Sequence, residues 1–314
     1  WCCFSGGLSS ESGLPTQYQP ARLSIRRGNF GFTNIGCPGR ARLFNRGTSF
    51  NGKDMIELYQ FWDSPCCMKV RMVLAEKGLE WELRPIATYK FDHYQPDYQA
   101  LNPHSLVPTL VHNGQPVIQS SNIAEYLDEM FPDLPLKPVD TTARAQMREW
   151  MKEEEFLFRL IVTLSFNIMM KMRAAAYGME QLREWSLRHP DQGRAQDYLN
   201  RVSSPADMAA VAAAEDKLRW HMERLEKQLR TSGGPWICGA TFSLADICVA
   251  GIVDRIEYLD REHVWQGLPA VTGWVAAIRA RPSYGIAAPA FEDRMWGPLK
   301  PVPDAEPTLD GADR

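Results

Sequence analysis

The residues best suited to chemistry form the run Ser64-Pro65-Cys66-Cys67, which directly follows a short strand-like pattern. Proline is favoured at the first position of a helix, so Ser64 is expected at a helix amino terminus. The unpaired backbone N–H groups there favour negative charge. Ser64 could therefore stabilise a thiolate, and Cys66 could form one. Ordinary capping by Ser64 and simple burial of the cysteines are the alternative interpretations.

Two further segments carry candidate binding groups. Val107-Pro108 opens a strand, and most X–Pro bonds are trans, so the residues alone predict a trans bond. Gln119-Ser120 opens a helix whose N–H groups and serine hydroxyl could hold a carboxylate, with plain capping as the alternative. Ser243-x-x-Asp246 is a capping box and is interpreted as structural.

The elements that would position these residues begin with a strand–helix–strand unit. Alternating apolar residues predict a strand over 56–61 and a second strand over 81–86, and the helix between them covers 65–77. Asn113-Gly114 predicts a hairpin, and a helix is expected over 120–130. This order is typical of a small α/β domain.

Everything beyond a proline-rich linker at 131–139 has helical periodicity. Helices are expected over 141–173, 206–230, 243–258 and 268–281, and the polar stretch 177–205 is interpreted as an insertion between helices. The predicted fold class is therefore α/β plus all-α, with a domain over 55–131 and an all-helical domain over 140–297.

The two ends of the chain differ from these domains. Residues 1–54 carry a net charge of +5 and lack a sustained apolar period, which predicts a disordered extension or a mis-set start. Residues 298–314 are rich in proline and aspartate and are expected to form a loose tail.

Composition excludes several protein classes. The 314 residues are 45% apolar and 23% charged with a net charge of -3, so neither a nucleic-acid partner nor a membrane span is expected. The cysteine count is low and odd, at 7, and shows no zinc-like spacing. We therefore predict no metal and a reducing, cytoplasmic compartment.

Taken together, these motifs resemble the cytosolic glutathione transferase superfamily over about residues 56–291. The carrying features are Ser-Pro at a helix start, Val107-Pro108 before a hairpin, Gln119-Ser120 at the next helix, and Ser-Leu-Ala-Asp in the helical part. The resemblance implies a thioredoxin-like first domain that binds glutathione as cosubstrate. It also implies a homodimer with a detoxification role.

The resemblance also implies roles for single residues. Ser64 would activate the glutathione thiol, and Val107, before a cis Pro108, would pair with the cysteinyl part of glutathione. Gln119 and Ser120 would hold its γ-glutamyl group. The helical domain would line the site of a small hydrophobic electrophile, and the candidates there are Phe156, Phe158, Phe166, Met169, Met170 and Trp220, with core packing as the alternative.

Cys66 leaves the reaction type open. Ser64-Pro65-Cys66 is similar to the Ser-x-Cys pattern of zeta-class isomerases and tetrachlorohydroquinone reductive dehalogenases, and the chain resembles bacterial β-etherases more loosely. The leading hypothesis is a glutathione transferase that uses Ser64. The alternatives are a reductive dehalogenase or lyase that uses Cys66 through a mixed disulfide, and a non-catalytic interaction module of the same fold.

Overall fold

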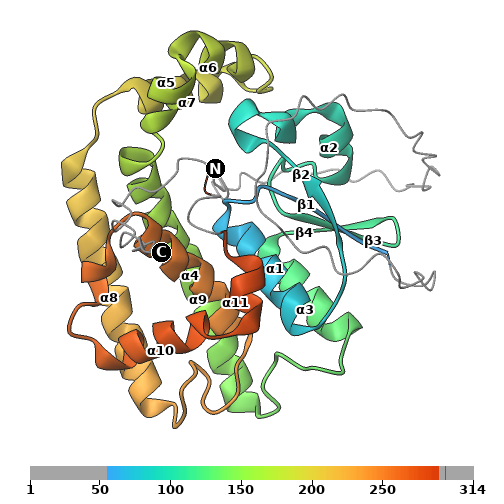
Figure 1. Cartoon of the computed structure of the whole chain (residues 1–314), viewed down its shortest axis with the longest axis vertical. Helices are drawn as coiled ribbons and strands as arrows, with labels where there is room; N and C mark the ends of the chain where they lie inside the picture. Colours follow the sequence, from blue (N-terminus) through green and yellow to red (C-terminus); the bar gives the residue numbers. More distant parts are fainter. Residues whose placement is uncertain (1–54, 290–293, 295–314) are drawn as a thin grey trace, which may run out of the picture.

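The computed structural model describes residues 55–289 and 294. The extension expected over 1–54 and the tail expected over 298–314 lie outside the described residues. Figure 1 shows a sheet region and a larger helical region side by side, in agreement with the predicted fold class of α/β plus all-α.

The sheet has four strands in the order β2-β1-β3-β4. β1 (Ile56–Gln60) pairs in parallel with β2 (Glu82–Pro85) and antiparallel with β3 (Thr109–His112), and β3 pairs antiparallel with β4 (Gln115–Ile118). Asn113 and Gly114 in the connecting turn both have positive φ, at 51° and 81°. The predicted hairpin is therefore confirmed, because asparagine and glycine tolerate this backbone conformation.

Helices α1 (Pro65–Glu76) and α3 (Ser120–Met130) contact each other beside the sheet. The stretch between β2 and β3 also forms short helices that the sequence patterns did not predict. They are the 3₁₀ turns η1 (Thr88–Lys90) and η2 (Asp92–Tyr94), followed by α2 (Pro96–Leu101). Helices this short bury too few residues to produce a clear apolar period.

The helical region is built around two long helices and a buried third one. Its elements are α4 (Thr141–Ile168), α8 (Met208–Thr231), α9 (Leu244–Tyr258), η3 (Glu262–Trp265), α10 (Pro269–Arg279) and α11 (Pro282–Ala287). The capping box at the start of α9 is confirmed, since the Asp246 carboxylate accepts from the Ser243 backbone N–H at 2.9 Å.

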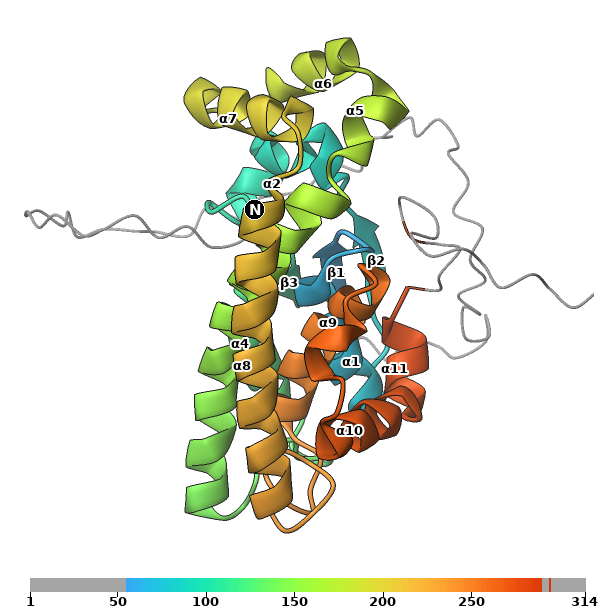
Figure 2. The same cartoon turned by 90° about the vertical axis from the view of Figure 1, so that its left-hand side faces the viewer.

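The polar stretch between α4 and α8 folds into three short helices. α5 (Met172–Tyr177), α6 (Met179–Ser186) and α7 (Gln192–Ser203) lie at one end of the molecule, next to the short helices of the sheet region (Figures 1 and 2). The helix predicted over 141–173 therefore ends at Ile168, and a turn separates it from α5.

A single large apolar core joins the two regions, because α1 packs against α9 and α11. The closest approach lies at the start of α1. A β-carbon on Gly251 of α9 would stand only 2.9 Å from the Pro65 carbonyl oxygen. Glycine at this position allows the helical region to reach the amino end of α1, where the candidate chemistry lies.

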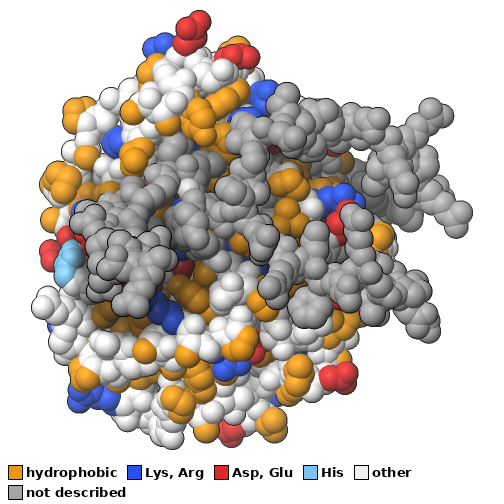
Figure 3. Space-filling view, viewed as in Figure 1, with side chains coloured by type: hydrophobic (Ala, Val, Ile, Leu, Met, Phe, Trp, Pro, Cys, Tyr) orange, Lys and Arg blue, Asp and Glu red, His pale blue; other side chains and the backbone are white. Residues whose placement is uncertain are grey.

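The surface and the helix lengths bear on possible partners. Among the described residues, no helix combines the length and the apolar character that crossing a bilayer requires. On the face drawn in Figure 3, the acidic and basic side chains of the described residues are interspersed among polar and hydrophobic ones.

Candidate active site

Ser64 stands at the amino end of α1, as the sequence predicted. Its Oγ accepts from the backbone N–H of Cys67 at 3.4 Å, and Pro65 occupies the first helical turn. The first turn contains no acidic side chain that would offset the partial positive charge of the helix end. This end of α1 is therefore suited to an anionic group.

A cavity of about 130 Å³ opens beside Ser64, between the sheet region and the helical region. Phe61, Asp63, Pro65 and Val107 line it from the sheet region, together with residues of η1, η2 and the loop before β3. The opposite wall comes from α4, α5, α7 and α9. Most of this wall is apolar. It consists of Phe158, Ile161, Val162, Ser165, Phe166, Met169, Met170, Arg173, Tyr198 and Arg255.

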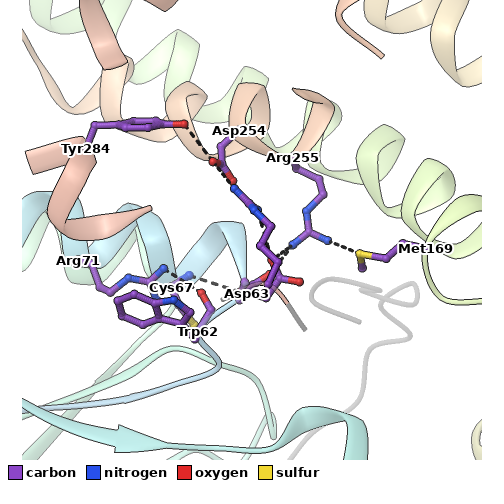
Figure 4. Close-up of polar contacts among 10 residues, drawn as sticks. Trp62, Asp63, Cys67, Arg71, Met169, Asp254, Arg255 and Tyr284 are labelled. Atoms are coloured by element: carbon purple, nitrogen blue, oxygen red, sulfur yellow. Dashed lines mark hydrogen bonds and ion pairs between the residues drawn. The ribbon is translucent and has the colours of Figure 1, made fainter. Parts of the chain in front are cut away.

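A buried ionic network holds the residue before Ser64. The Asp63 carboxylate Oδ1 accepts from Arg255 at 3.0 Å and from Arg294 at 3.3 Å (Figure 4). Arg255 also donates to the Asp63 backbone carbonyl and contacts the sulfur of Met169 at 3.3 Å. The two arginines thus balance the Asp63 charge and tie the amino end of α1 to the helical region.

The same network continues away from the cavity. Arg294 donates to Asp254 Oδ1 at 2.6 Å, and the Tyr284 hydroxyl donates to the same oxygen at 3.0 Å. Burial and the neighbouring Asp254 carboxylate raise the pKa of Tyr284, so its hydroxyl stays protonated and continues to donate. These groups support the site from behind and do not line the main cavity.

Cys66 and Cys67 do not face this cavity. Cys66 is 8% exposed and belongs to the large apolar core, whereas Cys67 is fully buried against Tyr98 and Val107. Neither is among the residues that line the cavity beside Ser64. The structure therefore places Ser64 in the cavity wall and Cys66 outside it, although only Pro65 lies between them in the sequence and the residue types make both candidates for catalysis.

Val107 and Pro108 lie where the sequence analysis expected a strand to begin, and Val107 lines the cavity. The Val107–Pro108 bond is cis. This confirms what the resemblance implied and corrects the trans bond expected from residue types alone. The intrinsic preference for trans is only about 0.5–1 kcal/mol, so the surrounding fold can decide the isomer.

Gln119 and Ser120 start α3, as predicted, but they are not among the cavity-lining residues. Gln119 is exposed and has φ of 71°, an unusual backbone conformation for a residue with a side chain. The Ser120 hydroxyl accepts from the buried Lys69 ammonium at 3.2 Å, beside Ser121 at 3.1 Å. Lys69 also bonds Glu154 of α4 at 2.8 Å.

Of the six residues expected to line an electrophile site, four lie in the wall of this cavity. Phe158, Phe166, Met169 and Met170 line the cavity, whereas Phe156 and Trp220 are 54% and 55% exposed and point away from it. Phe156 and Phe158 are two positions apart on one helix, which places them about 200° apart around its axis. Residue type alone could not separate them.

Sequence reasoning missed three charged residues of the cavity, namely Asp63, Arg173 and Arg255. Arg173 comes after three methionines in 169–172, and Arg255 lies within the largely apolar segment 244–258, which was the available signal. A charge in such a run is rarely buried without a specific role. Among the described residues, no group of histidine, cysteine and carboxylate side chains is arranged to hold a metal ion.

Two family models match the chain. One, described as the glutathione S-transferase N-terminal domain, covers residues 63–130, and the other, described as the glutathione S-transferase C-terminal domain, covers residues 208–277. The first match includes Ser64, Val107 and Gln119. Residues 131–207, which include α4 to α7, lie between the two matches.

Similar proteins share most of this architecture. Protein LigF from Sphingobium sp. (strain NBRC 103272 / SYK-6) is 28% identical over 239 residues, which cover 73% of this chain and 91% of LigF. Tetrachloro-p-hydroquinone reductive dehalogenase from Sphingobium chlorophenolicum is 25% identical over 241 residues, which cover 74% of this chain and 95% of the dehalogenase. The crystal structure of β-etherase LigF from Sphingobium sp. strain SYK-6 matches with a TM-score of 0.65 at 26% identity, covering 74% of this chain and 98% of the LigF chain.

Proposed function

This chain belongs to the glutathione S-transferase family, whose enzymes use glutathione as cosubstrate, and from that premise we propose that Ser64 stabilises the glutathione thiolate for attack on a small hydrophobic electrophile. The observation that carries the proposal is the position of Ser64, which caps α1 and lines the cavity between the two regions. The family also argues for an enzyme over a non-catalytic interaction module.

The energy that Ser64 must supply is modest. A free thiol has a pKa of about 8.5, and lowering it by about two units costs about 2.7 kcal/mol. One hydrogen bond to a charged group contributes about 1.5–3 kcal/mol, and a helix end adds about 0.3–1 kcal/mol. The Ser64 hydroxyl uses a lone pair for the Cys67 N–H, which leaves its hydrogen for donation to the sulfur.

The proposed reaction is a displacement or addition at carbon. The glutathione thiol loses its proton to solvent, and the sulfur then forms a bond to the electrophilic carbon. In a displacement, the leaving group departs with the electron pair of its bond. The neutralised Asp63 beside Ser64 favours this step, because an uncompensated carboxylate there would repel the thiolate.

We also propose the glutathione-binding residues. Val107 and Pro108 would bind the cysteinyl part, and Gln119 and Ser120 would bind the γ-glutamyl group. The cavity position of Val107 supports the first assignment. The positive φ of exposed Gln119 supports the second, because unusual backbone conformations in folded proteins cluster at ligand sites.

Cys66 would carry the alternative reaction, in which a reductive dehalogenase or lyase forms a mixed disulfide with glutathione. Similarity to a reductive dehalogenase favours it. The burial of Cys66 outside the cavity weighs against it, because thiol exchange requires access to the sulfur. We therefore rank the Ser64 reaction first.

Titration of the bound thiol tests the proposal. The ultraviolet absorbance of the thiolate is followed against pH for glutathione bound to wild type, Ser64→Ala and Cys66→Ala. We expect the pKa of bound glutathione to rise by about one to two units in Ser64→Ala, from the loss of about 1.5–3 kcal/mol. An unchanged pKa in Ser64→Ala would refute the role of Ser64. A mixed disulfide trapped in wild type and lost in Cys66→Ala would establish the alternative.

We further propose a cytoplasmic homodimer with a detoxification role, as is common for this family. The low, odd cysteine count supports a reducing compartment. Light scattering at micromolar concentration tests the assembly, and a monomer mass there would contradict it.

A further inference from the structure

Arg294 belongs to the last part of the chain, yet its side chain reaches the amino end of α1. It lies beyond both family-model matches, which end at residues 130 and 277. The residue is buried, with 8% exposed. Its Nη1 donates to the Asp63 carboxylate at 3.3 Å, and its Nη2 donates to the Asp254 carboxylate of α9 at 2.6 Å. One guanidinium therefore bridges the residue before Ser64 and a carboxylate of the helical region.

A second, narrow crevice adjoins the main cavity at the amino end of α1. Asp63, Ser64, Pro65 and Arg255 line both spaces, and the remaining lining residues of the crevice are Met68, Asp254, Pro289 and Arg294. The crevice has no room for a water molecule. Charges are screened weakly where water is excluded, so a charge in this crevice acts strongly on an anionic group held at Ser64.

The charges that line the crevice are matched in number. They come from two arginines, Arg255 and Arg294, and two aspartates, Asp63 and Asp254. Asp63 bonds both arginines, whereas Arg294 is the only cation bonded to Asp254 among the described residues. The Tyr284 hydroxyl also donates to Asp254 at 3.0 Å, but this donor is neutral (Figure 4). Loss of the Arg294 charge would therefore leave one negative charge in excess beside Ser64.

The other ionisable groups around the sulfur position come from three further places. His93 of η2 lines the main cavity, and burial lowers its pKa to about 3, so it is neutral at pH 7. Arg173 of α5 lines the opposite wall, and its Nη1 donates to the Tyr198 hydroxyl at 2.8 Å. Arg71 of α1 lines neither space and donates to three uncharged oxygen acceptors. A substitution of Arg294 leaves these groups in the chain, so it changes the charge of the crevice alone.

We propose that Arg294 is a positioning residue for the reaction at Ser64, which keeps the glutathione sulfur ionised by compensating the charges of Asp63 and Asp254. The inference rests on the proposed function and deepens it by adding a residue that is remote in sequence. A like charge disfavours ionisation of its neighbour, so an uncompensated carboxylate in the crevice would return the proton to the thiol.

The packing of Arg294 allows its charge to be removed without opening a hole. Its guanidinium carbon lies 4.5 Å from the centroid of the buried Tyr258 ring, and that of Arg255 lies 5.5 Å from the same centroid. Methionine has a similar length and a sulfur that packs well against aromatic rings. Arg294→Met is therefore the variant of choice, because it keeps the contact with Tyr258 and removes the charge.

Titration of bound glutathione tests the proposal. The ultraviolet absorbance of the thiolate is followed against pH for wild type, Arg294→Met and Arg294→Lys. The pKa of bound glutathione should rise by about 0.5–1.5 units in Arg294→Met, which is about a 3- to 30-fold fall in the acid dissociation constant of the thiol. Arg294→Lys keeps the charge and should recover most of this shift. An unchanged pKa in Arg294→Met would overturn the proposal.

Asp254→Asn supplies the opposite change in charge. It removes a carboxylate from the crevice, so the pKa of bound glutathione should fall below the wild-type value. The double variant Arg294→Met/Asp254→Asn restores the balance and should return to within about 0.3 units of wild type. General damage to the site would instead raise the pKa in all three variants, and that result would refute the proposal. If Arg294→Met alone fails to fold, Asp254→Asn and the double variant still decide the question.

Arg281→Met is the matched control, because it removes an ion pair at the other end of α1. Arg281 donates to both carboxylate oxygens of Glu76, at 2.7 and 2.6 Å. Glu76 ends the 12-residue α1, about 18 Å from its amino end. This variant should lose stability and keep the wild-type pKa of bound glutathione, and an equal rise there would contradict the role of Arg294.

The same titration separates failure of this inference from failure of the proposed function. A wild-type pKa equal to that of free glutathione would overturn the proposed function and this inference with it. A lowered wild-type pKa that rises in Ser64→Ala and stays constant in Arg294→Met would overturn this inference alone.

Discussion

Two helix starts in the sheet region begin with serine, yet their surroundings differ. Ser64 at α1 faces a cavity, and its hydroxyl accepts a long hydrogen bond from the Cys67 backbone N–H at 3.4 Å. Ser120 at α3 accepts from buried Lys69, which also bonds Glu154 of the helical region. A hydroxyl beside a cavity can serve a ligand, whereas a hydroxyl bonded to a buried cation contributes first to the domain interface.

The same contrast is found along α1, where Ser64 at the start faces the ligand cavity and Lys69 one turn later stabilises the interface between the two regions. Lys69 lies only five positions after Ser64, but it is closed off by α3 and α4. Burial alone lowers the pKa of the Lys69 ammonium, and the neighbouring Cys248 and Glu154 more than reverse this, so its net pKa is raised. Lys69 therefore remains charged, and a buried ammonium is stable only while its partners Ser120, Ser121 and Glu154 stay bonded to it.

Removing the positive charge of Lys69 should have the largest effect of the variants considered, and it should act on the stability of the fold. Lys69→Met leaves Glu154 buried without its cation and should lower the free energy of unfolding by about 3–5 kcal/mol. Urea unfolding measures the loss, and Lys152→Met at an exposed position of α4 is the control. A loss below about 1 kcal/mol would mean that the pair behaves like a surface ion pair and would blur the contrast.

The two serines should separate in activity. Ser64→Ala should reduce kcat/KM about 10- to 150-fold, the equivalent of about 1.5–3 kcal/mol for one charge-assisted hydrogen bond. Ser120→Ala should act through the KM for glutathione and through stability, with a smaller change in kcat. Steady-state kinetics of both variants at saturating electrophile measures this. Equal losses of kcat would erase the distinction between the two helix starts.

The third prediction concerns His93, which lines the cavity and should make the stability of the protein sensitive to acid. Burial lowers the pKa of His93 to about 3 from an ordinary value of 6.5. Its neutral form therefore favours folding fully above pH 6.5, and stability falls by up to about 1.4 kcal/mol per pH unit as the pH drops from 6.5 towards 3.

Urea unfolding between pH 7 and pH 4 measures this slope. His93→Phe should flatten it by the contribution of one proton, and His104→Phe at an exposed position should not. Identical slopes in wild type and His93→Phe would show that other groups dominate the acid response.

The smallest effect concerns the backbone at the start of α3. Gln119 has φ of 71°, where glycine carries no side-chain penalty, so Gln119→Gly should raise the free energy of unfolding by about 1 kcal/mol. The control Gln115→Gly, in strand β4, should lower it by about 0.5–1 kcal/mol. A stabilised Gln119→Gly with a raised glutathione KM would indicate that the unusual backbone serves binding. A lower free energy of unfolding in Gln119→Gly would contradict the idea that the positive φ of Gln119 strains the backbone.

Much of the fold could be predicted because local signals agree with it. Pro65 and Gly78 bracket α1, the Asn113-Gly114 turn defines the hairpin, and the capping box starts α9. The short helices between β2 and β3 were missed because they bury too few residues to show a period. The helices between α4 and α8 were missed because the segment is largely polar, although α7 buries Ala195, Tyr198, Leu199 and Val202 at helical spacing. The domain boundaries at 55–131 and 140–297 and the roles of the site residues stay predictions.

The amino-acid sequence by itself determined where the strands and the longer helices begin and which residues could hold a thiolate. Caps, prolines and apolar periods act over a few positions, so their information is local. Only the tertiary structure decided that Ser64 faces a cavity while Cys66 is buried, that Ser120 holds Lys69, and that Arg173 joins the wall opposite Ser64. Those outcomes depend on which distant helix packs against each position, and no local pattern encodes that choice.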